Sequence, residues 1–267
     1  MKAPLLAAAC ALAATACNVD QPAPANETTV EPAAEAPVAP QGKPVELKSE
    51  TSLLNWEVSW PAEVNAIPAL EKSIRDPAEK ALAELTKQAR EDKAEREKQG
   101  FDFNGYEYSV AVKVAGQTPR LLSLTGDWMD YTGGAHPNHG TDGMLWDKVS
   151  GTKIDLAGLL GDGGSLDRLY RDAFCKALNA ERAKKREGLD AVSDPDDPFS
   201  QCPKFSELQI VPKGPEQGGP MTTLLFHANP YVAGPYVEGD YDIELPVSAA
   251  FIAALKPEYR SSFAAKR

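Results

Sequence analysis

The sequence predicts an α+β fold in which antiparallel sheets pack with two main helices and a short C-terminal helix. Apolar residues alternate with polar ones in several short segments, as at Trp56, Val58 and Trp60, which indicates half-buried strands. Two longer segments carry apolar residues at helical spacing. Strands and helices do not alternate regularly along the chain, which argues against a doubly wound parallel sheet. The composition, 42% hydrophobic and 25% charged, is that of an ordinary globular protein.

The first main helix is expected to begin at Asp76. Asp76 can act as the N-cap, Pro77 fits the first helical position, and Glu79 stands three residues after the cap. Leu70 and Ile74 are assigned to a separate preceding turn. The helix then continues through an apolar stripe and ends at Gly100. The stripe consists of Leu82, Leu85 and Ala89.

A hairpin is expected next, because residues 106–114 and 122–128 alternate on either side of a turn at 116–119. A glycine-rich loop, 132–143, follows. Two short strands, 144–146 and 153–156, should then flank the turn at Ser150 and Gly151.

The second half of the chain predicts a second main helix, capped by Ser165. An acidic, proline-rich loop at 188–204 follows and is expected to be solvated rather than a calcium site. Strands are expected at 206–211, 221–228 and 240–245. Ser248 should cap the short C-terminal helix, which ends before Pro257.

The N-terminus predicts export and a lipid anchor. Residues 1–16 have a basic start, a short apolar core and small residues at the end, as in a secretory signal peptide. Ala14 to Cys17 resembles the bacterial lipobox, so Cys17 is the expected lipidation site; the alternative is a plain signal peptide. Residues 17–45 predict a proline- and alanine-rich tether, and 46–267 the folded domain. We therefore expect a lipid-anchored protein of the bacterial cell envelope, on its periplasmic or outer-membrane face.

The net charge indicates which classes of binding partner to expect, and the cysteine count predicts a disulfide. The chain has a net charge of −11, which makes nucleic acid an unexpected partner and favours a cationic one. Removal of the signal and lipidation of Cys17 leave two cysteines in an oxidising compartment. We therefore expect Cys175 and Cys202 to form a disulfide.

The histidines are the main candidates for chemistry. His136 and His139, with His227, offer imidazole ligands for zinc, but their spacing matches no established zinc motif. The interpretation we prefer is structural, with His136 buried and bonded to its loop backbone. The sequence contains no Gly-x-Ser-x-Gly nucleophile motif. We therefore assign no catalytic residue, metal or cofactor from the sequence.

Two irregular segments are candidate binding loops. One contains Gly133, Gly134, His136 and Asn138, and the other, within 226–240, contains Tyr231 and Tyr236. Tyrosines can fill a gap between irregular loops while their hydroxyls bond backbone carbonyls. We therefore expect the two loops to lie against each other and to form either a packing contact or a recognition surface.

Both segments resemble a known domain family. The run Tyr131 to Asn138, followed by Trp146-Asp147, is similar to the Gly-Gly-Ala-His region of RsiV-like ectodomains. Residues 226–245 resemble the aromatic C-terminal motif of the same family. The resemblance extends over roughly 47–256. The same family includes the domain that precedes the catalytic domain of PdaC-like peptidoglycan deacetylases.

The resemblance implies an α+β envelope module concerned with lysozyme or peptidoglycan. We expect a non-enzymatic binding lipoprotein whose ligand is a lysozyme-like cationic protein or a cell-wall glycan. The alternative is an envelope hydrolase or deacetylase that uses His136 with nearby Asp130 or Asp142, with or without zinc. A third interpretation is a purely structural envelope component.

The lipid anchor can be tested directly. Cys17→Ser should abolish incorporation of a labelled fatty acid and release or mis-process the protein, because serine lacks the thiol that carries the lipid. Cys10→Ser, which changes a cysteine inside the apolar core, is the matched control and should leave labelling intact. Unchanged labelling of Cys17→Ser would contradict the assignment.

Overall fold

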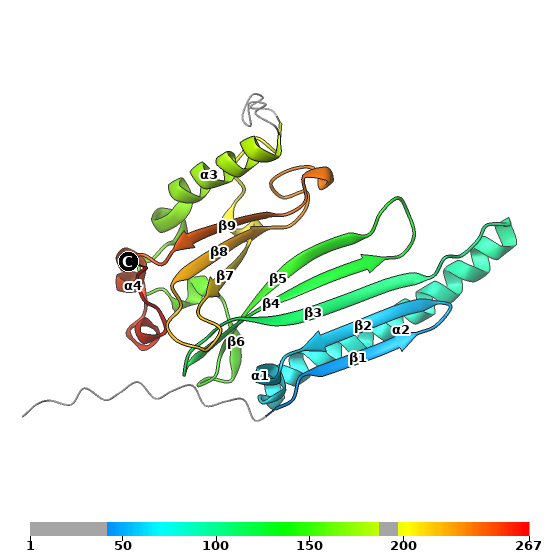
Figure 1. Ribbon diagram of the computed structural model, residues 1–267, viewed down its shortest axis with the longest axis horizontal. Coiled ribbons are helices and arrows are strands. Elements are labelled where there is room, and N and C mark those ends of the chain that lie inside the picture. The colour runs from blue at the N-terminus through cyan, green and yellow to red at the C-terminus, as the bar shows by residue number, and fades with distance from the viewer. Residues whose placement is uncertain (1–41, 187–196, 267) are drawn as a thin grey trace, which may run out of the picture. The chain divides into compact units, whose positions relative to one another are not determined.

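The computed structural model describes residues 42–186 and 197–266, all within one unit, Pro37–Arg267. The predicted signal peptide, Cys17 and residues 17–41 of the expected tether lie outside the described residues, as do residues 187–196 of the acidic loop. The predicted α+β fold class is confirmed. It consists of a six-stranded sheet, a three-stranded sheet and two long helices (Figure 1).

The six-stranded sheet follows chain order. Its strands are β1 (Val45–Glu50), β2 (Leu54–Trp60), β3 (Tyr106–Gln117), β4 (Leu121–Tyr131), β5 (Asn138–Asp147) and β6 (Thr152–Ile154). Neighbouring strands are antiparallel except β2 and β3, which are parallel. A parallel pair needs a long crossover, and here α1 (Ala62–Asn65) and α2 (Pro68–Gln99) provide it. The sheet is therefore mixed, because this single crossover departs from the expected antiparallel pattern.

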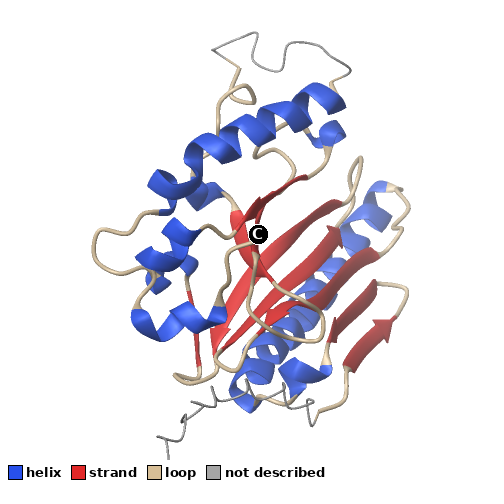
Figure 2. Ribbon diagram, turned by 60° about the vertical axis from the view of Figure 1, so that its left-hand side comes forward, coloured by secondary structure: helices blue, strands red, loops and turns tan. Residues whose placement is uncertain are grey.

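Helix α2 lies along the first strands of this sheet (Figure 2). The alternation predicted for β2 is confirmed, because Trp56, Val58 and Trp60 are buried with Leu70 of α2 in one apolar cluster. On β4, Leu122 and Leu124 belong to the same cluster, whereas Leu121 belongs to a second one. Successive side chains of a strand point to opposite faces, so each face of the sheet supports a separate core.

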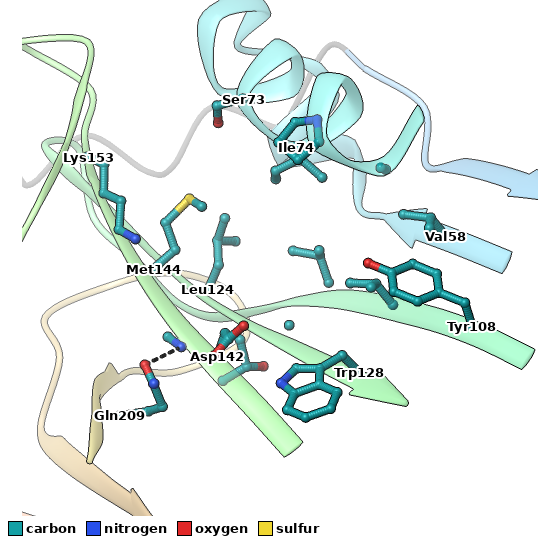
Figure 3. A pocket seen from close by; sticks show the side chains of 17 residues that line it. Val58, Ser73, Ile74, Tyr108, Leu124, Trp128, Asp142, Met144, Lys153 and Gln209 are labelled. Atoms are coloured by element: carbon teal, nitrogen blue, oxygen red, sulfur yellow. Dashed lines mark hydrogen bonds between the residues drawn. The ribbon is translucent and has the colours of Figure 1, made fainter. Parts of the chain in front are cut away.

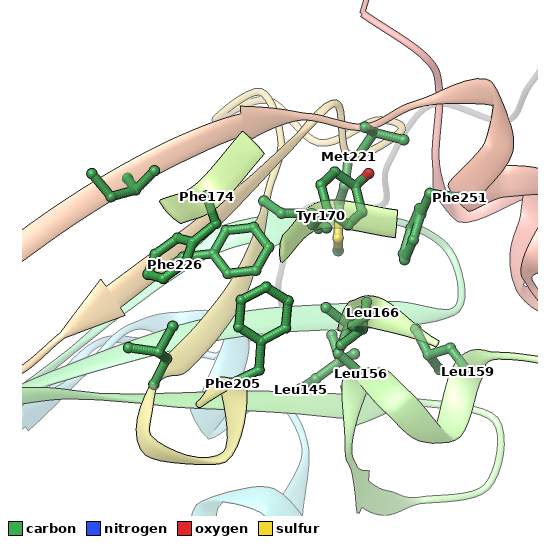
Figure 4. Close-up of a cluster of buried hydrophobic side chains, with 14 of the residues drawn as sticks. Leu145, Leu156, Leu159, Leu166, Tyr170, Phe174, Phe205, Met221, Phe226 and Phe251 are labelled. Carbon is green, nitrogen blue, oxygen red and sulfur yellow. The ribbon is translucent and has the colours of Figure 1, made fainter. Parts of the chain in front are cut away.

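The second cluster surrounds the three-stranded sheet. Its strands are β7 (Gln209–Lys213), β8 (Thr223–Ala228) and β9 (Tyr241–Pro246). Helix α3 (Leu166–Lys185) contacts β9, and Phe174 on α3 packs on Phe226 and Phe205 with ring centroids 5.3 and 5.4 Å apart (Figure 4). The remaining short elements are η1 (Leu156–Leu159), η2 (Phe205–Glu207), η3 (Tyr236–Glu238), α4 (Ala249–Ala254) and η4 (Pro257–Ser262).

Both predicted serine caps are present. Ser165 accepts a hydrogen bond from the Arg168 N–H at the start of α3, and Ser248 accepts one from the Phe251 N–H at the start of α4. The expected disulfide also forms, with the Cα atoms of Cys175 and Cys202 5.6 Å apart. It ties α3 to the segment that precedes β7.

The predicted start of the first helix is wrong. Helix α2 begins at Pro68, so Pro77 lies in its interior and Asp76 pairs with Lys72 at 2.5 Å rather than capping. Pro68 occupies the first helical position, where no N–H is needed. Burial of Leu70, which is fully enclosed, favours helix across the region that the local signals divide in two. Two further differences are β1, which the sequence did not predict, and β5, which begins at Asn138 within the expected loop 132–143.

The proline inside α2 should lower the stability of the folded protein, and this effect can be measured. Pro77 has no N–H for the Ser73 carbonyl, so Pro77→Ala restores one helical hydrogen bond. We expect the free energy of unfolding to rise by about 2 kcal/mol, which is the helix penalty of proline less its effect on the unfolded chain. Pro68→Ala is the matched control and should change it little. Denaturant titration measures both, and equal effects would contradict this account.

Candidate functional site

The candidate site consists of two loops, which we call the histidine loop (132–137) and the tyrosine loop (229–240). The histidine loop joins β4 to β5 and turns at Gly133 and Gly134, whose φ angles are 96° and 119°. These left-handed angles favour glycine. A side chain at Gly133 would also displace the Arg96 guanidinium at the end of α2, which would lie 2.8 Å from its Cβ.

Three aromatic rings join the two loops in a row that we call the ring stack. Tyr236 stacks on His136 with ring centroids 3.8 Å apart and planes 20° apart, and Tyr231 lies 5.7 Å from Tyr236. The Tyr236 hydroxyl donates to the Pro137 carbonyl at 2.6 Å, and His139 Nδ1 lies 3.2 Å from the same hydroxyl. The two loops therefore lie against each other, as the sequence predicted.

Tyr231 combines backbone strain with exposure. It is the non-glycine residue with positive φ, at 69°, among the described residues, and its side chain is 56% exposed. Its N–H donates to the Gly234 carbonyl at 3.0 Å, which closes a tight turn. Such strain persists only when the surroundings enforce it, and it concentrates at functional positions. Val237, in the same loop, is 90% exposed.

An ion pair fixes the base of the tyrosine loop to α3. Arg186 Nε lies 2.8 Å from Glu238 Oε1, and both side chains are largely buried. Burial raises the pKa of Glu238, but bonds from Arg186 and Tyr241 outweigh it and hold that pKa below its ordinary value. Burial and the bond to Glu238 in turn raise the pKa of Tyr241 to about 12. A side chain at Gly234 would collide with the Glu238 carboxylate, 2.1 Å from its Cβ position.

Asn229 joins the tyrosine loop to the open edge of β5. Its Oδ1 accepts the Thr141 N–H at 2.7 Å and its Nδ2 donates to the Thr141 carbonyl at 3.3 Å, as a neighbouring strand would do. Further along the same edge, the Gly143 N–H donates to Gln209 Oε1 at 3.1 Å. Two side chains thus satisfy backbone groups that β6 does not reach.

Next to Asn229 lies a buried histidine that the sequence offered only as a zinc ligand. His227 is 3% exposed; its Nδ1 lies 2.6 Å from Asp242 Oδ1 and its Nε2 2.8 Å from Asn229 Oδ1. Asn229 is oriented by Thr141, so both ring nitrogens of His227 face acceptor oxygens. An imidazole that donates from both nitrogens is the charged form. Accordingly, burial alone would lower the pKa of His227, but these hydrogen bonds hold it above the ordinary 6.5.

Most of the residues predicted for the two binding loops come together in the structure, but Asn138 does not, and His136 is not buried. Gly133, Gly134, His136, Tyr231 and Tyr236 come together, as described above. The prediction that His136 is buried is wrong: it is exposed, and its Nδ1 donates to the adjacent Pro137 carbonyl at 2.9 Å. It lies at the outer end of the ring stack, where neither core covers it. Asn138 is also exposed and donates to Asp130 Oδ2 at 3.4 Å instead of joining the stack.

The sequence did not predict that Asn229 and Gln209 hydrogen-bond the backbone along the open edge of β5. Asn229 was visible as a polar residue directly after an apolar strand, which is a turn signal. Nothing in the sequence indicates its partner, 88 residues away. Gln209 carried no signal beyond its place in an expected strand.

The zinc and enzyme hypotheses gain no support from this geometry. Both His136 and His139 contact Tyr236, whereas His227 bonds Asp242 and Asn229. Across residues 42–186 and 197–266, no group of three or more His, Cys, Asp or Glu side chains is arranged to hold a metal ion. The ion pairs of the same residues include none between His136 and Asp130 or Asp142.

The chain is similar to an envelope deacetylase family over part of its length. Residues 47–139 match the family described as "PdaC: Deacetylase PdaC". The matched segment begins within β1, passes through the histidine loop and ends at the second residue of β5. The predicted resemblance to PdaC-type domains is thus supported for this segment. No curated protein matches the chain.

Two solved structures are similar to it at low identity. One is a DUF3298 family protein from Pseudomonas aeruginosa PAO1, 18% identical, with a TM-score of 0.47, covering 85% of this chain and 98% of that one. The other is a DUF3298 family member from Bacteroides fragilis, 18% identical, with a TM-score of 0.46, covering 76% and 89%. In the part of this chain that is described, no helix is both long and apolar enough to cross a membrane.

The His227–Asp242 pair predicts a pH dependence of stability. The folded-state pKa of His227 is raised, so the contribution of the pair is complete below about pH 6.5 and is lost as pH rises through the folded-state pKa. His227 holds the pKa of Asp242 below the ordinary 3.8, so the contribution also falls in strong acid.

Asp242→Asn should therefore lower the free energy of unfolding more at about pH 5.5 than at about pH 9. Denaturant titration of both proteins at each pH gives the difference. Glu216→Gln, an exposed carboxylate in the turn between β7 and β8, serves as the control, and its effect should not change with pH. A pH-independent effect of Asp242→Asn would show that His227 is neutral.

Proposed function

We propose that the chain is a non-enzymatic binding domain of the bacterial cell envelope that recognises a lysozyme-like cationic protein through the ring stack. The observation that carries the proposal is Tyr231, whose exposed ring is held at a strained backbone position by the turn to Gly234 and lies beside Tyr236. A fold that needed this segment only for packing would not hold a large ring in solvent at such a cost.

The surroundings of Tyr231 suit a protein partner. Tyr231, Tyr236, Val237 and His136 place apolar and aromatic groups together at the tips of two adjoining loops. Exposed apolar patches of this kind are typical of interaction sites. Tyrosine is among the residues that contribute most binding energy at protein interfaces, because a rigid ring loses little conformational entropy.

Charge and family similarity support the cationic partner and the location. The net charge of −11 would attract a cationic protein over long range and speed its association. The match of residues 47–139 to the PdaC family favours the envelope, as does the lipid anchor expected at Cys17. The RsiV-like resemblance of the two loops adds lysozyme as the specific class of partner.

The second candidate ligand is a cell-wall glycan. The observation that favours it is the same family match, since the family is described as a deacetylase. Flat exposed rings such as Tyr231 also suit stacking on sugars. Binding to isolated peptidoglycan, measured beside binding to a c-type lysozyme, distinguishes the two ligands.

Substitution of Tyr231 tests the site. Tyr231→Ala should weaken lysozyme binding about 30-fold or more, which is the loss expected at an interface hot spot. Tyr231→Gly removes the same ring and relieves the positive φ, so it should bind equally weakly while leaving the folded state at least as stable. Titration calorimetry measures affinity, and thermal unfolding measures stability.

The matched control is Phe101→Ala. Phe101 is 63% exposed, in the segment after α2, so its removal deletes a comparable exposed ring. It should leave binding unchanged. If the Tyr231 variants bind lysozyme as tightly as the original protein, the proposed site is wrong; if they lose only peptidoglycan binding, the glycan is the ligand.

A further inference from the structure

A groove separate from the ring stack lies between α2 and the sheet. It has a volume of about 690 Å³, with β3, β4 and β5 as its floor and α2 as one wall (Figure 3). Most of the lining is apolar, which suits a ligand that buries hydrocarbon. The apolar lining includes Ile74 and Pro77 on α2, Val110 and Val112 on β3, Leu124 on β4 and Met144 on β5.

Trp128 is the tryptophan that lines this groove. The chain has four tryptophans, and Trp56, Trp60 and Trp146 are at most 5% exposed in the cores. Trp128 is only half-buried and lines the groove. Its ring extends over Gly140 on β5, where a Cβ would lie 2.8 Å from Trp128 Cζ2. The absence of a side chain at Gly140 thus lets the indole lie against the sheet.

Two carboxylates flank Trp128 on the same face of the sheet. Asp130 is two residues further along β4, and Asp142 on β5 pairs with Gly126, two residues before Trp128. Residues two apart along a strand share a face. Tyr108 pairs with Asp130 from the other side, and its pKa is raised by burial and then by the charges of Asp130 and Asp142. This end of the groove is therefore negative.

The opposite end of the groove is positive. Lys153 of β6 lies on the Met144 side, whereas Trp128 and Tyr108 lie on the other side (Figure 3). Asp142 and Lys153 are both exposed. Within residues 42–186 and 197–266, no ion pair includes Asp142 or Lys153. An apolar floor thus separates an available carboxylate from an available ammonium group.

We propose that this groove binds an extended peptide segment with a basic side chain and, some residues later, a carboxylate. The basic group lies over Trp128 between Asp130 and Asp142, where cation–π attraction and ion pairing act together. The carboxylate lies toward Lys153, and the apolar stem and backbone of the peptide cover the floor. The proposal does not depend on the ring stack, because the two sites share no residue.

The charges favour a peptide over a neutral sugar chain. A neutral ligand would remove water from Asp142 and Lys153 without supplying an opposite charge, and unpaired charges are costly to desolvate. A peptide with charges of both signs pairs with both ends of the groove and is held in one direction. The order of its charges therefore matters as well as their number.

Trp128 makes binding observable in the complete protein. The probe is the peptide acetyl-Lys-Ala-Ala with a free C-terminal carboxylate, titrated at low salt while tryptophan emission is recorded. We expect a saturable change in emission that Trp128→Phe abolishes. Asp142→Asn and acetylation of the probe lysine should each weaken binding about 10-fold, which corresponds to one desolvated cation contact. Lys153→Gln should also weaken it.

Matched controls separate this site from general effects. Glu216→Gln removes an exposed carboxylate outside the groove and should not alter the affinity for the probe. Tyr231→Ala should not alter it either, so failure of the lysozyme proposal would leave this result standing. Thermal unfolding verifies that each variant is folded.

Two results would overturn the proposal. One is equal affinity of the original protein and Asp142→Asn for the peptide, since the carboxylate would then make no contact. The other is a saturable emission change with an oligomer of N-acetylglucosamine but none with the peptide, which would make the groove a sugar site.

Discussion

The unpaired edge of β5 is the constraint that anchors the tyrosine loop and so places it against the histidine loop. Beyond the three residues that pair with β6, this edge of β5 presents backbone N–H and C=O groups that are hydrogen-bonded to no strand among the described residues. Such groups must find partners when they are covered. Asn229 supplies both for Thr141, with one carboxamide acting as a short strand, and Gln209 supplies one for Gly143. These bonds act together with the apolar cluster that Leu121 and Leu145 share with Phe226 to hold the three-stranded sheet against the six-stranded one.

The tyrosine loop follows from this contact. Asn229 is its first residue, so the bond to Thr141 fixes where the loop begins, and the Arg186–Glu238 pair fixes its far end on α3. Between these anchors, Tyr236 reaches the histidine loop and Tyr231 stays in solvent. His227 reinforces the first anchor, because its Nε2 bonds the same Asn229 oxygen that holds Thr141. The hydrogen bonds of His227 are thus part of how the loop is positioned.

Strand β5 contributes residues to both candidate surfaces, the ring stack and the groove under α2. His139 and Thr141 of β5 meet the tyrosine loop, whereas Asp142 and Met144 line the groove under α2. Gly140 lies between them: a Cβ there would be 2.6 Å from Asn229 Oδ1 and 2.8 Å from Trp128 Cζ2. Glycine at this position therefore allows the edge contact and the indole to coexist. The segment that matches the PdaC family ends at residue 139, so each surface combines residues from inside and outside that match.

The sequence by itself determined the features that depend on neighbouring residues. The alternation in β2, the hairpin of β3 and β4, the serine caps of α3 and α4, the pairing of Cys175 with Cys202 and the adjacency of the two loops could all be predicted. Most of these rest on local periodicity, on short-range hydrogen bonds or on the elimination of other partners, whereas the adjacency of the two loops was expected because tyrosines suit the gap between two irregular segments. The tertiary structure decided the rest. It began α2 at Pro68 rather than at Asp76 because burial of Leu70 outweighs the local start signal at Asp76 and Pro77, and it left His136 exposed because no core covers the loop tip. It also assembled Thr141, Asn229, His227 and Asp242 from two sheets, since hydrogen bonds between residues 88 positions apart leave no pattern along the chain.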